Sequence, residues 1–322
     1  VIEIDFNSDE AIYMQITNQI IMGIATSRLH EGDTLPSVRQ LASIAGINMH
    51  TVNKAYALLR QEGFVTIDRR KGAVISIDAD KVRALEEMKQ KPFIMIGATS
   101  SGSGKTTFTL GLLRLLRNRG MKVQPFKCGP DYIDTKHHAM AVGEESVNLD
   151  SYMASAAHVR ELYARYGAAS DVCVTEGVMG LFDGYDGMKG SSAEIAELIG
   201  IPVVLVLNAK STAYTVAPVL YGFKHFYPGI RVVGVVFNFV ASVAHYAYLQ
   251  QACVDAGVEA LGYIPKDESI VIPSRHLGLS IDETFCFDAF ADRVAEVIDK
   301  TVNVDRLLEL CTVEFSGKQT EG

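Results

Sequence analysis

The sequence predicts an α/β protein in two parts, with a small helical segment at the N-terminus and a larger segment built on a mostly parallel β-sheet. Three observations support this prediction. The 322 residues exceed what one hydrophobic core usually holds. Near residue 90 the pattern changes from helical periodicity to short β-rich runs that alternate with helices. Between the two, Asp80 to Lys91 is charged and free of glycine, as expected of a linker.

The composition is that of an ordinary folded protein, with 48% hydrophobic and 21% charged residues, which excludes a disordered or collagen-like chain. No apolar run approaches the roughly 18 residues that span a bilayer, and the first residues lack the pattern of a signal peptide. The five cysteines are scattered and form no C-x-x-C pair, which argues against disulfides and zinc. We therefore expect a cytoplasmic protein with no membrane partner.

The first segment predicts three helices followed by a hairpin. Residues 11–27 carry isoleucines four positions apart, which is typical of an amphipathic helix. A short second helix follows Pro36-Ser37, a tight turn contains Gly46, and a third helix runs from about residue 49 to 62. Two strands, at 64–67 and 73–77, enclose a turn at 68–72. This order is that of a winged helix-turn-helix, which we assign to residues 1–78, with a linker at 79–91.

The third helix is the expected DNA reader, because in this motif its first residues enter the major groove. Asn53 carries the group that reads adenine, and Lys54 suits guanine or phosphate. The residues expected to contact DNA are Arg39, His50, Thr51, Asn53 and Lys54 on the two helices, and Arg69, Arg70 and Lys71 at the wing tip. The competing interpretation is a set of solvated charges, since residues 1–90 carry a net charge of −2.

Three stretches support the DNA-binding interpretation more specifically. Residues 11–16, 32–42 and 51–63 closely resemble the GntR family of bacterial regulators. That resemblance implies a transcription regulator whose partner is double-stranded operator DNA. We expect a homodimer, because one small module offers few phosphate contacts and helix-turn-helix proteins pair across half-sites.

The larger segment alternates strands with helices, which is typical of a parallel sheet covered on both faces. The predicted strands are residues 93–96, 122–126, 172–175, 202–207, 232–237 and 260–264. We assign this domain to residues 92–302 and expect a C-terminal tail at 303–322.

A glycine-rich loop lies between the first of these strands and a helix at 106–119. Backbone N–H groups of such a loop, together with the helix N-terminus, bind phosphates. Lys105 would reach the β- and γ-phosphates, and the Thr106 hydroxyl would ligate Mg²⁺. Thr99 stands where the strict P-loop pattern has its first glycine. The expected nucleotide-binding residues are Ser101, Gly102, Ser103, Gly104, Lys105, Thr106 and Thr107.

The first glycine of this loop stands two residues earlier, at Gly97, and this shifted pattern resembles that of the P-loop ligases related to dethiobiotin synthetase. Four further motifs, at residues 126–134, 148–153, 175–184 and 273–279, look very like the ATP-dependent half of cobyrinic acid a,c-diamide synthase. The resemblance implies a P-loop NTPase domain that uses ATP and Mg²⁺ to activate a carboxylate as an acyl phosphate.

Roles for individual side chains follow from this resemblance and from the chemistry of the groups. Mg²⁺ takes oxygen ligands and substrate phosphates, and arginine holds carboxylates with a bidentate fork. We expect Thr106, Asp131 and Glu176 as metal ligands; Lys127, Asp134 and Glu176 as catalytic groups; Ser274, Arg275 and His276 as substrate ligands; and Asn238 as the adenine reader.

Simpler interpretations exist for some of these residues. Asp131 and Asp134 suit turn positions beside Pro130, and His137 and His138 are expected to be surface histidines, because no third ligand stands at metal spacing.

Proteins of the family that this domain resembles continue into a glutaminase domain that makes ammonia. This chain stops about where that domain would begin. Cys311 has no histidine after it and is not expected to be the glutaminase nucleophile. Asn208 and Phe239 stand where an acidic and a basic residue are expected. We therefore expect a transcription regulator whose ATP- and Mg²⁺-binding domain senses a ligand, with a corrinoid precursor as candidate. The alternative is an active ATP-dependent amidoligase of cobalamin biosynthesis that uses ammonia or a separate glutaminase.

Overall fold

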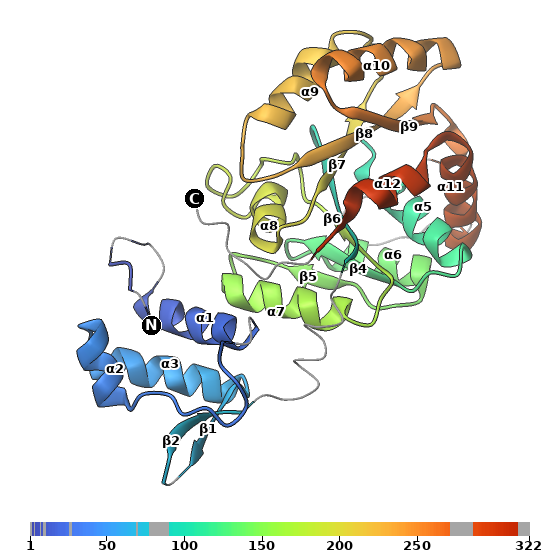
Figure 1. Cartoon of the computed structure of the whole chain (residues 1–322). Helices are drawn as coiled ribbons and strands as arrows, with labels where there is room; N and C mark the ends of the chain where they lie inside the picture. The colour runs from blue at the N-terminus through green and yellow to red at the C-terminus, as the bar shows by residue number, and fades with distance from the viewer. Residues whose placement is uncertain are drawn as a thin grey trace. The chain divides into compact units, whose positions relative to one another are not determined.

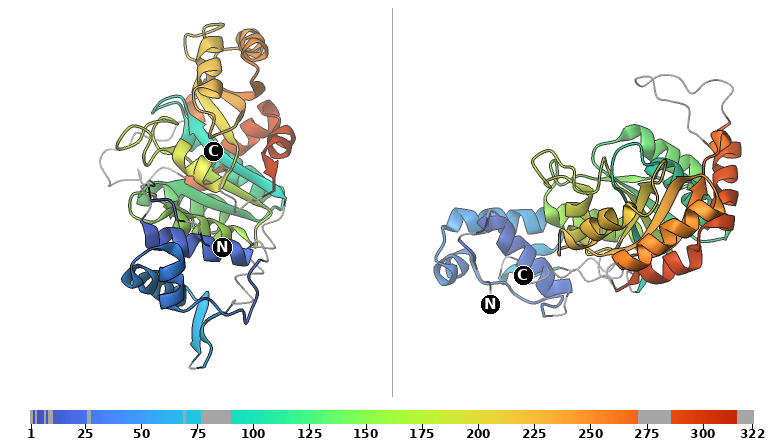
Figure 2. Two further views of the ribbon diagram at one scale, coloured as in Figure 1. Left: turned by 60° about the vertical axis from the view of Figure 1, so that its left-hand side comes forward. Right: turned by 90° about the horizontal axis from the view of Figure 1, so that it is seen from above.

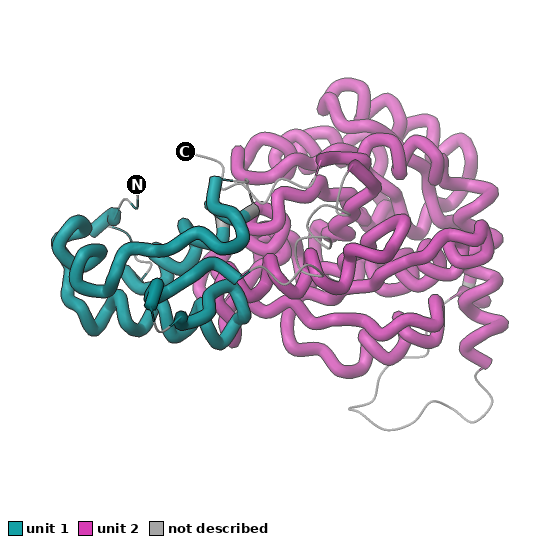
Figure 3. The backbone as a smooth tube through the Cα atoms, turned by 60° about the horizontal axis from the view of Figure 1, so that its bottom comes forward, with its two compact units in different colours: residues 1–87, 317–322 teal, residues 88–316 magenta. Residues whose placement is uncertain are grey.

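The structure, a computed structural model, describes residues 2, 4–6, 8, 11–25, 28–68, 70–76, 90–270 and 286–314. The chain divides into two compact units, residues 1–87 with 317–322 and residues 88–316 (Figure 3). Most of the expected linker at 79–91 falls outside the described residues, and Lys91 is already the first residue of strand β3 (Lys91–Ala98).

The smaller unit has the predicted winged helix-turn-helix order (Figure 1). Its elements are α1 (Ile12–Ala25), α2 (Val38–Ala45), α3 (Met49–Gln61), β1 (Val65–Asp68) and β2 (Gly72–Ile75). The strands pair antiparallel, from Val65 opposite Ile75 to Asp68 opposite Gly72. The isoleucine stripe of α1 supplies the core as predicted, since Ile16 and Ile20 are buried with Leu59 of α3.

Short-range hydrogen bonds define the turn between α2 and α3. Ser37 begins α2 with a capping box, in which its hydroxyl accepts from the Gln40 N–H while the Gln40 side chain accepts from the Ser37 N–H. Gly46 ends α2 in the left-handed region, at φ +66°. The Asn48 side chain then accepts from the His50 N–H and starts α3, as predicted. These caps and the Gly46 turn set the direction in which α3 leaves α2.

The larger unit is an α/β domain with an eight-stranded sheet among the described residues. Its other strands are β4 (Val123–Cys128), β5 (Val147–Leu149), β6 (Val172–Glu176), β7 (Val203–Asn208), β8 (Val232–Val240), β9 (Glu259–Pro265) and β10 (Thr312–Val313). The order β5-β4-β6-β3-β7-β8-β9 is parallel throughout, and β10 pairs antiparallel with the start of β3. The mostly parallel sheet is therefore confirmed.

Helices cover both faces of this sheet (Figures 1 and 2). Right-handed crossovers place them according to the direction in which the chain moves along the sheet. One face carries α5 (Lys105–Asn118), α6 (Tyr132–Val142), α11 (Phe287–Thr301) and α12 (Val304–Cys311), and the other carries α7 (Ala156–Gly167), α8 (Ser192–Ile199), α9 (Val216–His225) and α10 (Val243–Ala256). A short 3₁₀ turn spans Glu268–Ile270. The strand order reverses direction at β3, where such folds bind ligands.

The C-terminal segment corrects the expected tail. Residues 303–314 form helix α12 and strand β10 instead of extending from the domain. Leu307 and Cys311 are fully buried in the core that also contains α5 and α11. Their burial is the physical reason, because apolar side chains three and four positions apart on α12 need a hydrophobic partner.

Candidate nucleotide and DNA sites

The glycine-rich loop joins the carboxyl end of β3 to the first turn of α5. Gly102 and Gly104 adopt φ of +77° and +92°, which favour glycine. Gly104 begins α5 and offers no side chain to bond the first N–H groups of the helix. These N–H groups and the helix dipole suit an anion, and phosphate binding at this loop stays a prediction. Ser101 and Gly102 are exposed, while Ser103 is buried and donates its hydroxyl to the Ser100 carbonyl.

Asn238 supports this loop from strand β8. Its amide nitrogen donates to the Ser103 carbonyl oxygen at 3.0 Å, and its amide oxygen accepts from the Phe239 N–H at 2.9 Å. The side chain is 4% exposed. A Cβ on Gly104 would lie 1.8 Å from the Asn238 amide nitrogen, so the loop and β8 require glycine here. Adenine recognition by Asn238 stays a prediction.

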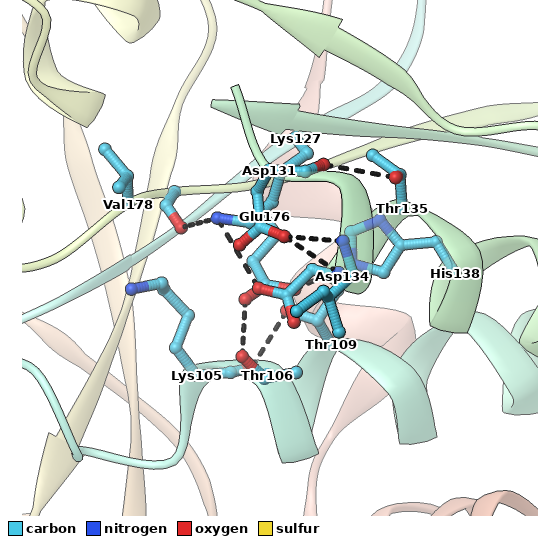
Figure 4. A network of polar contacts seen from close by, with 12 residues as sticks. Lys105, Thr106, Thr109, Lys127, Asp131, Asp134, Thr135, His138, Glu176 and Val178 are labelled. Carbon is cyan, nitrogen blue, oxygen red and sulfur yellow. Dashed lines mark hydrogen bonds and ion pairs between the residues drawn. The ribbon is translucent and has the colours of Figure 1, made fainter. Parts of the chain in front are cut away.

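Glu176 lies at the centre of a buried polar network at the end of β6 (Figure 4). One carboxylate oxygen accepts from the Thr106 hydroxyl at 2.6 Å, and the other lies 2.7 Å from His138 Nε2. Burial favours the neutral acid, but the hydrogen bond and charge of His138, with Lys127 and Thr106, lower the pKa of Glu176 to about 2. Glu176 is therefore an anion beside the phosphate loop.

Two lysines reach the same region. Lys127, on β4 and 2% exposed, donates to the Gly177 carbonyl at 3.0 Å and lies 3.7 Å from an Asp134 carboxylate oxygen. Lys105 donates to the Met179 carbonyl at 2.9 Å. Burial lowers the pKa of Lys105, while the charge of Glu176 opposes this. The structure therefore brings together Lys105, Thr106, Lys127, Asp134 and Glu176.

Asp131 is the N-cap of α6, so the turn interpretation describes its local role. Its carboxylate accepts from the backbone N–H groups of Ile133 and Asp134 at 2.9 and 3.0 Å. Burial opposes ionisation, yet these two hydrogen bonds and the charge of Lys127 lower the pKa of Asp131. An ionised, half-buried carboxylate next to the phosphate loop is compatible with a metal ligand, and that role stays a prediction.

His138 corrects the expectation of a surface histidine. The ring is fully buried, and its Nδ1 lies 3.0 Å from the Ser146 hydroxyl while Nε2 contacts Glu176. Asp134 and His138 lie four residues apart on α6 and both are buried, so one face of the helix points at the site. This spacing is the sequence signal that would have identified His138.

Exposed apolar side chains gather after three neighbouring strands at the same end of the sheet. The large exposed residues there are Tyr132 and Ile133 after β4, Tyr152 and Met153 after β5, and Met179 and Tyr185 after β6. The rings of Tyr152 and Tyr185 meet edge to face, with centroids 5.0 Å apart. We call these six residues the apolar rim of the phosphate site.

Other predicted residues have different outcomes. Ser274, Arg275 and His276 lie outside the described residues. Cys311 is in the core, and burial raises the pKa of its thiol to about 12. Phe239, one of the two departures, adopts φ +60°, and the other, Asn208, accepts from the Lys210 N–H.

The DNA-binding candidates lie mostly on the exposed surface of the smaller unit. Arg39, His50, Asn53 and Lys54 are exposed and Thr51 is half-buried. The Lys54 ammonium lies over the Tyr13 ring, 3.8 Å from its centroid. At the wing, Asp68 accepts from the backbone N–H groups of Arg70 and Lys71, whose side chains are exposed, and Arg69 lies outside the described residues.

The fold and the site define the class of the protein: a winged helix-turn-helix joined to a P-loop nucleotide-binding α/β domain. The chain belongs to the family described as "CobQ/CobB/MinD/ParA nucleotide binding domain", whose model matches residues 94–279. Residues 12–75 match the model "Bacterial regulatory proteins, gntR family". Both resemblances found in the sequence are thereby confirmed.

Different known proteins are similar to each of the two parts of the chain. Cobyrinate a,c-diamide synthase of Streptococcus sanguinis is 43% identical over 227 residues, covering 69% of this chain and 50% of the relative. The Salmonella typhimurium enzyme of the same name is 42% identical, covering 68% and 48%. The chain thus spans about half the length of these curated relatives. YtrA from Sulfolobus acidocaldarius, a GntR-family transcription factor of known structure, is 47% identical over 24% of this chain and 83% of its own, with a TM-score of 0.24.

Proposed function

We propose that this protein is a transcription regulator that binds operator DNA through its winged helix and senses a ligand through its nucleotide-binding domain. The observation that carries the proposal is that one chain contains both an exposed reading helix and an intact phosphate site. With a DNA-binding domain in the same chain, ligand binding at the nucleotide site could change DNA affinity, which a ligase does not need. The ligands we propose are Mg·ATP and a corrinoid precursor.

The phosphate site supports ATP with Mg²⁺ through its donor set. Within the described ranges, no three His, Cys, Asp or Glu side chains converge closely enough to hold a metal ion. Mg²⁺ is commonly held by one or two carboxylates together with substrate phosphates and water, so the donors present fit this ion. Thr106, Asp131 and Glu176 would hold it, and Lys105 and Lys127 would neutralise phosphate charge.

The apolar rim supports a large, partly apolar acid as the second ligand. Tyr132, Tyr152 and Tyr185 offer exposed aromatic faces, and Met153 and Met179 offer flexible apolar contacts, at the same end of the sheet as the phosphate loop. The names of the relatives point to cobyrinate, whose macrocycle and carboxylates suit such a rim beside two lysines. Mg·ATP supplies the phosphoryl group that activates a carboxylate when turnover occurs.

DNA binding is proposed to involve two copies of the chain. One small reading head makes few phosphate contacts, and helix-turn-helix proteins bind half-sites in pairs. Arg39, Arg70 and Lys71 would bind the backbone, while Asn53 would read a base. Sedimentation with a selected duplex should give two protein chains for each duplex.

The proposed function is tested by selecting binding sites from random duplex DNA with the full chain and by assaying ATP turnover on the same preparation. A regulator should enrich one sequence of two related half-sites. It should turn over ATP slowly with cobyrinic acid and ammonium present. Failure to enrich any sequence would contradict the regulatory role.

The alternative function is an ATP-dependent amidoligase that uses ammonia or a separate glutaminase. The buried network of Lys127, Asp134 and Glu176 favours it, because charged groups are costly to bury and are retained where they act on a substrate. Rapid, ammonium-dependent ATP turnover with cobyrinic acid, together with no selected DNA sequence, would establish this alternative instead.

A further inference from the structure

The His138 side chain is buried behind the phosphate site and makes polar contacts with groups on two other segments. Nε2 lies 2.7 Å from one Glu176 carboxylate oxygen, and Nδ1 lies 3.0 Å from the Ser146 hydroxyl in the loop after α6. A carboxylate only accepts hydrogen bonds, so Nε2 carries the proton that faces Glu176. The imidazole is therefore held at both ends and has one orientation.

Glu176 connects His138 to the first turn of α5, because its carboxylate contacts both His138 and Thr106. The second carboxylate oxygen of Glu176 accepts a hydrogen bond from the Thr106 hydroxyl, with 2.6 Å between the two oxygen atoms (Figure 4). When the hydroxyl donates toward Glu176, the lone pairs of Thr106 Oγ1 stay available to a cation, and Thr106 lies in the first turn of α5, where we propose that the phosphates bind. The contacts thus run from Ser146 through His138 and Glu176 to Thr106, and Ser146 and His138 lie beyond the residues that we propose as metal ligands.

We propose that His138 is a positioning residue, which fixes the Glu176 carboxylate and through it the Thr106 hydroxyl for the divalent cation of a bound nucleotide. The inference rests on the proposed nucleotide function, and it assigns a role to a residue that itself touches neither the metal nor the phosphates. Groups that orient metal ligands in this way typically change metal affinity by about 10- to 100-fold when they are removed.

The test measures ATP binding by calorimetry, first in EDTA and then across a series of Mg²⁺ concentrations. H138L removes both polar contacts, and we expect the Mg²⁺ concentration for half-maximal enhancement of ATP affinity to rise by about 10- to 100-fold. ATP affinity in EDTA should stay within about twofold. H138Q retains an N–H donor of similar reach and should recover most of the wild-type Mg²⁺ dependence. The control is His158→Ala, since His158 is half-exposed and contacts only Glu161 among the pairs observed.

Two further measurements separate positioning from a purely structural role. Circular dichroism and thermal unfolding establish whether each variant folds. S146A retains the His138 side chain but removes the partner of its Nδ1, so it should shift the Mg²⁺ midpoint in the same direction by a smaller factor. A folded H138L or S146A with an unchanged Mg²⁺ midpoint would overturn the inference while leaving the nucleotide site in place. Absence of ATP binding to the wild-type chain would instead overturn the proposed function, and the inference with it.

Discussion

At the residue scale, Lys105 provides the clearest test of the phosphate site. Its ammonium donates only to the Met179 carbonyl among the hydrogen bonds observed, so phosphate oxygens can replace this partner at small structural cost. Lys105→Ala should reduce ATP affinity by at least about tenfold, since a hydrogen bond to a charged group contributes about 1.5–3 kcal/mol. Calorimetry checks this, with the exposed Lys189→Ala as control. Unchanged ATP affinity would remove Lys105 from the site.

Gly104 offers a second test at this scale, because its backbone and its surroundings both require glycine. An alanine there would adopt φ +92° and place its Cβ 1.8 Å from the Asn238 amide nitrogen. Gly120 has a similar φ of +81° but nothing within 4 Å, so Gly120→Ala isolates the backbone strain of about 1–2 kcal/mol. Gly104→Ala should lower the unfolding temperature further than Gly120→Ala and should also abolish ATP binding. Equal effects of the two substitutions on both measurements would contradict the close packing of the loop.

Individual residues also show what the sequence could reveal about the site. The Gly102–Thr107 loop was predictable because its residue types and its position between a strand and a helix both indicate phosphate binding. His138 was not identified, since no third ligand stands at metal spacing beside His137 and His138 and both were therefore expected on the surface. Its contact with Glu176 depends on how closely α6 approaches β6, which is a property of tertiary packing.

At the element scale, Arg39 on helix α2 and Asn53 on helix α3 are predicted to perform different parts of DNA recognition. Asn53→Ala should relax specificity at one base pair and cost about 1–3 kcal/mol for the preferred site, because its amide is the group that reads adenine. Arg39→Ala should weaken binding to all sequences alike and make the salt dependence shallower by about one unit, as expected for a phosphate contact. Fluorescence anisotropy at several salt concentrations measures both, with Lys210→Ala as control. If both substitutions changed specificity equally, the roles proposed for α2 and α3 would be wrong.

Whole elements were easier to predict than their boundaries. Every predicted strand of the larger unit is present, because parallel strands buried on both faces appear as apolar runs bounded by turns. Helix α12 was missed as part of the domain, although Val304, Leu307 and Cys311 have helical spacing. A short amphipathic helix near the end of a chain resembles a tail until the surface that buries it is known.

At the scale of the whole molecule, the proposed sensor role requires the two units to influence each other. Among the described residues, no helix is both long and apolar enough to span a membrane. The segments that match the two family models lie in separate compact units. A ligand of the nucleotide domain can change DNA binding only if it binds the DNA-competent and DNA-free forms with different affinity. Such couplings typically amount to about 1–3 kcal/mol, which corresponds to a change of roughly 5- to 150-fold in affinity.

The most direct test of the central claim is therefore operator affinity measured with and without ligands of the nucleotide domain. Anisotropy titrations of the full chain with a selected duplex would be made alone, with Mg·ATP, and with Mg·ATP and cobyrinic acid. We predict that at least one of these additions changes operator affinity by about fivefold or more, and that Lys105→Ala abolishes the change. A change of less than about twofold under every condition, accompanied by rapid ammonium-dependent ATP turnover, would contradict the sensor role and support the amidoligase.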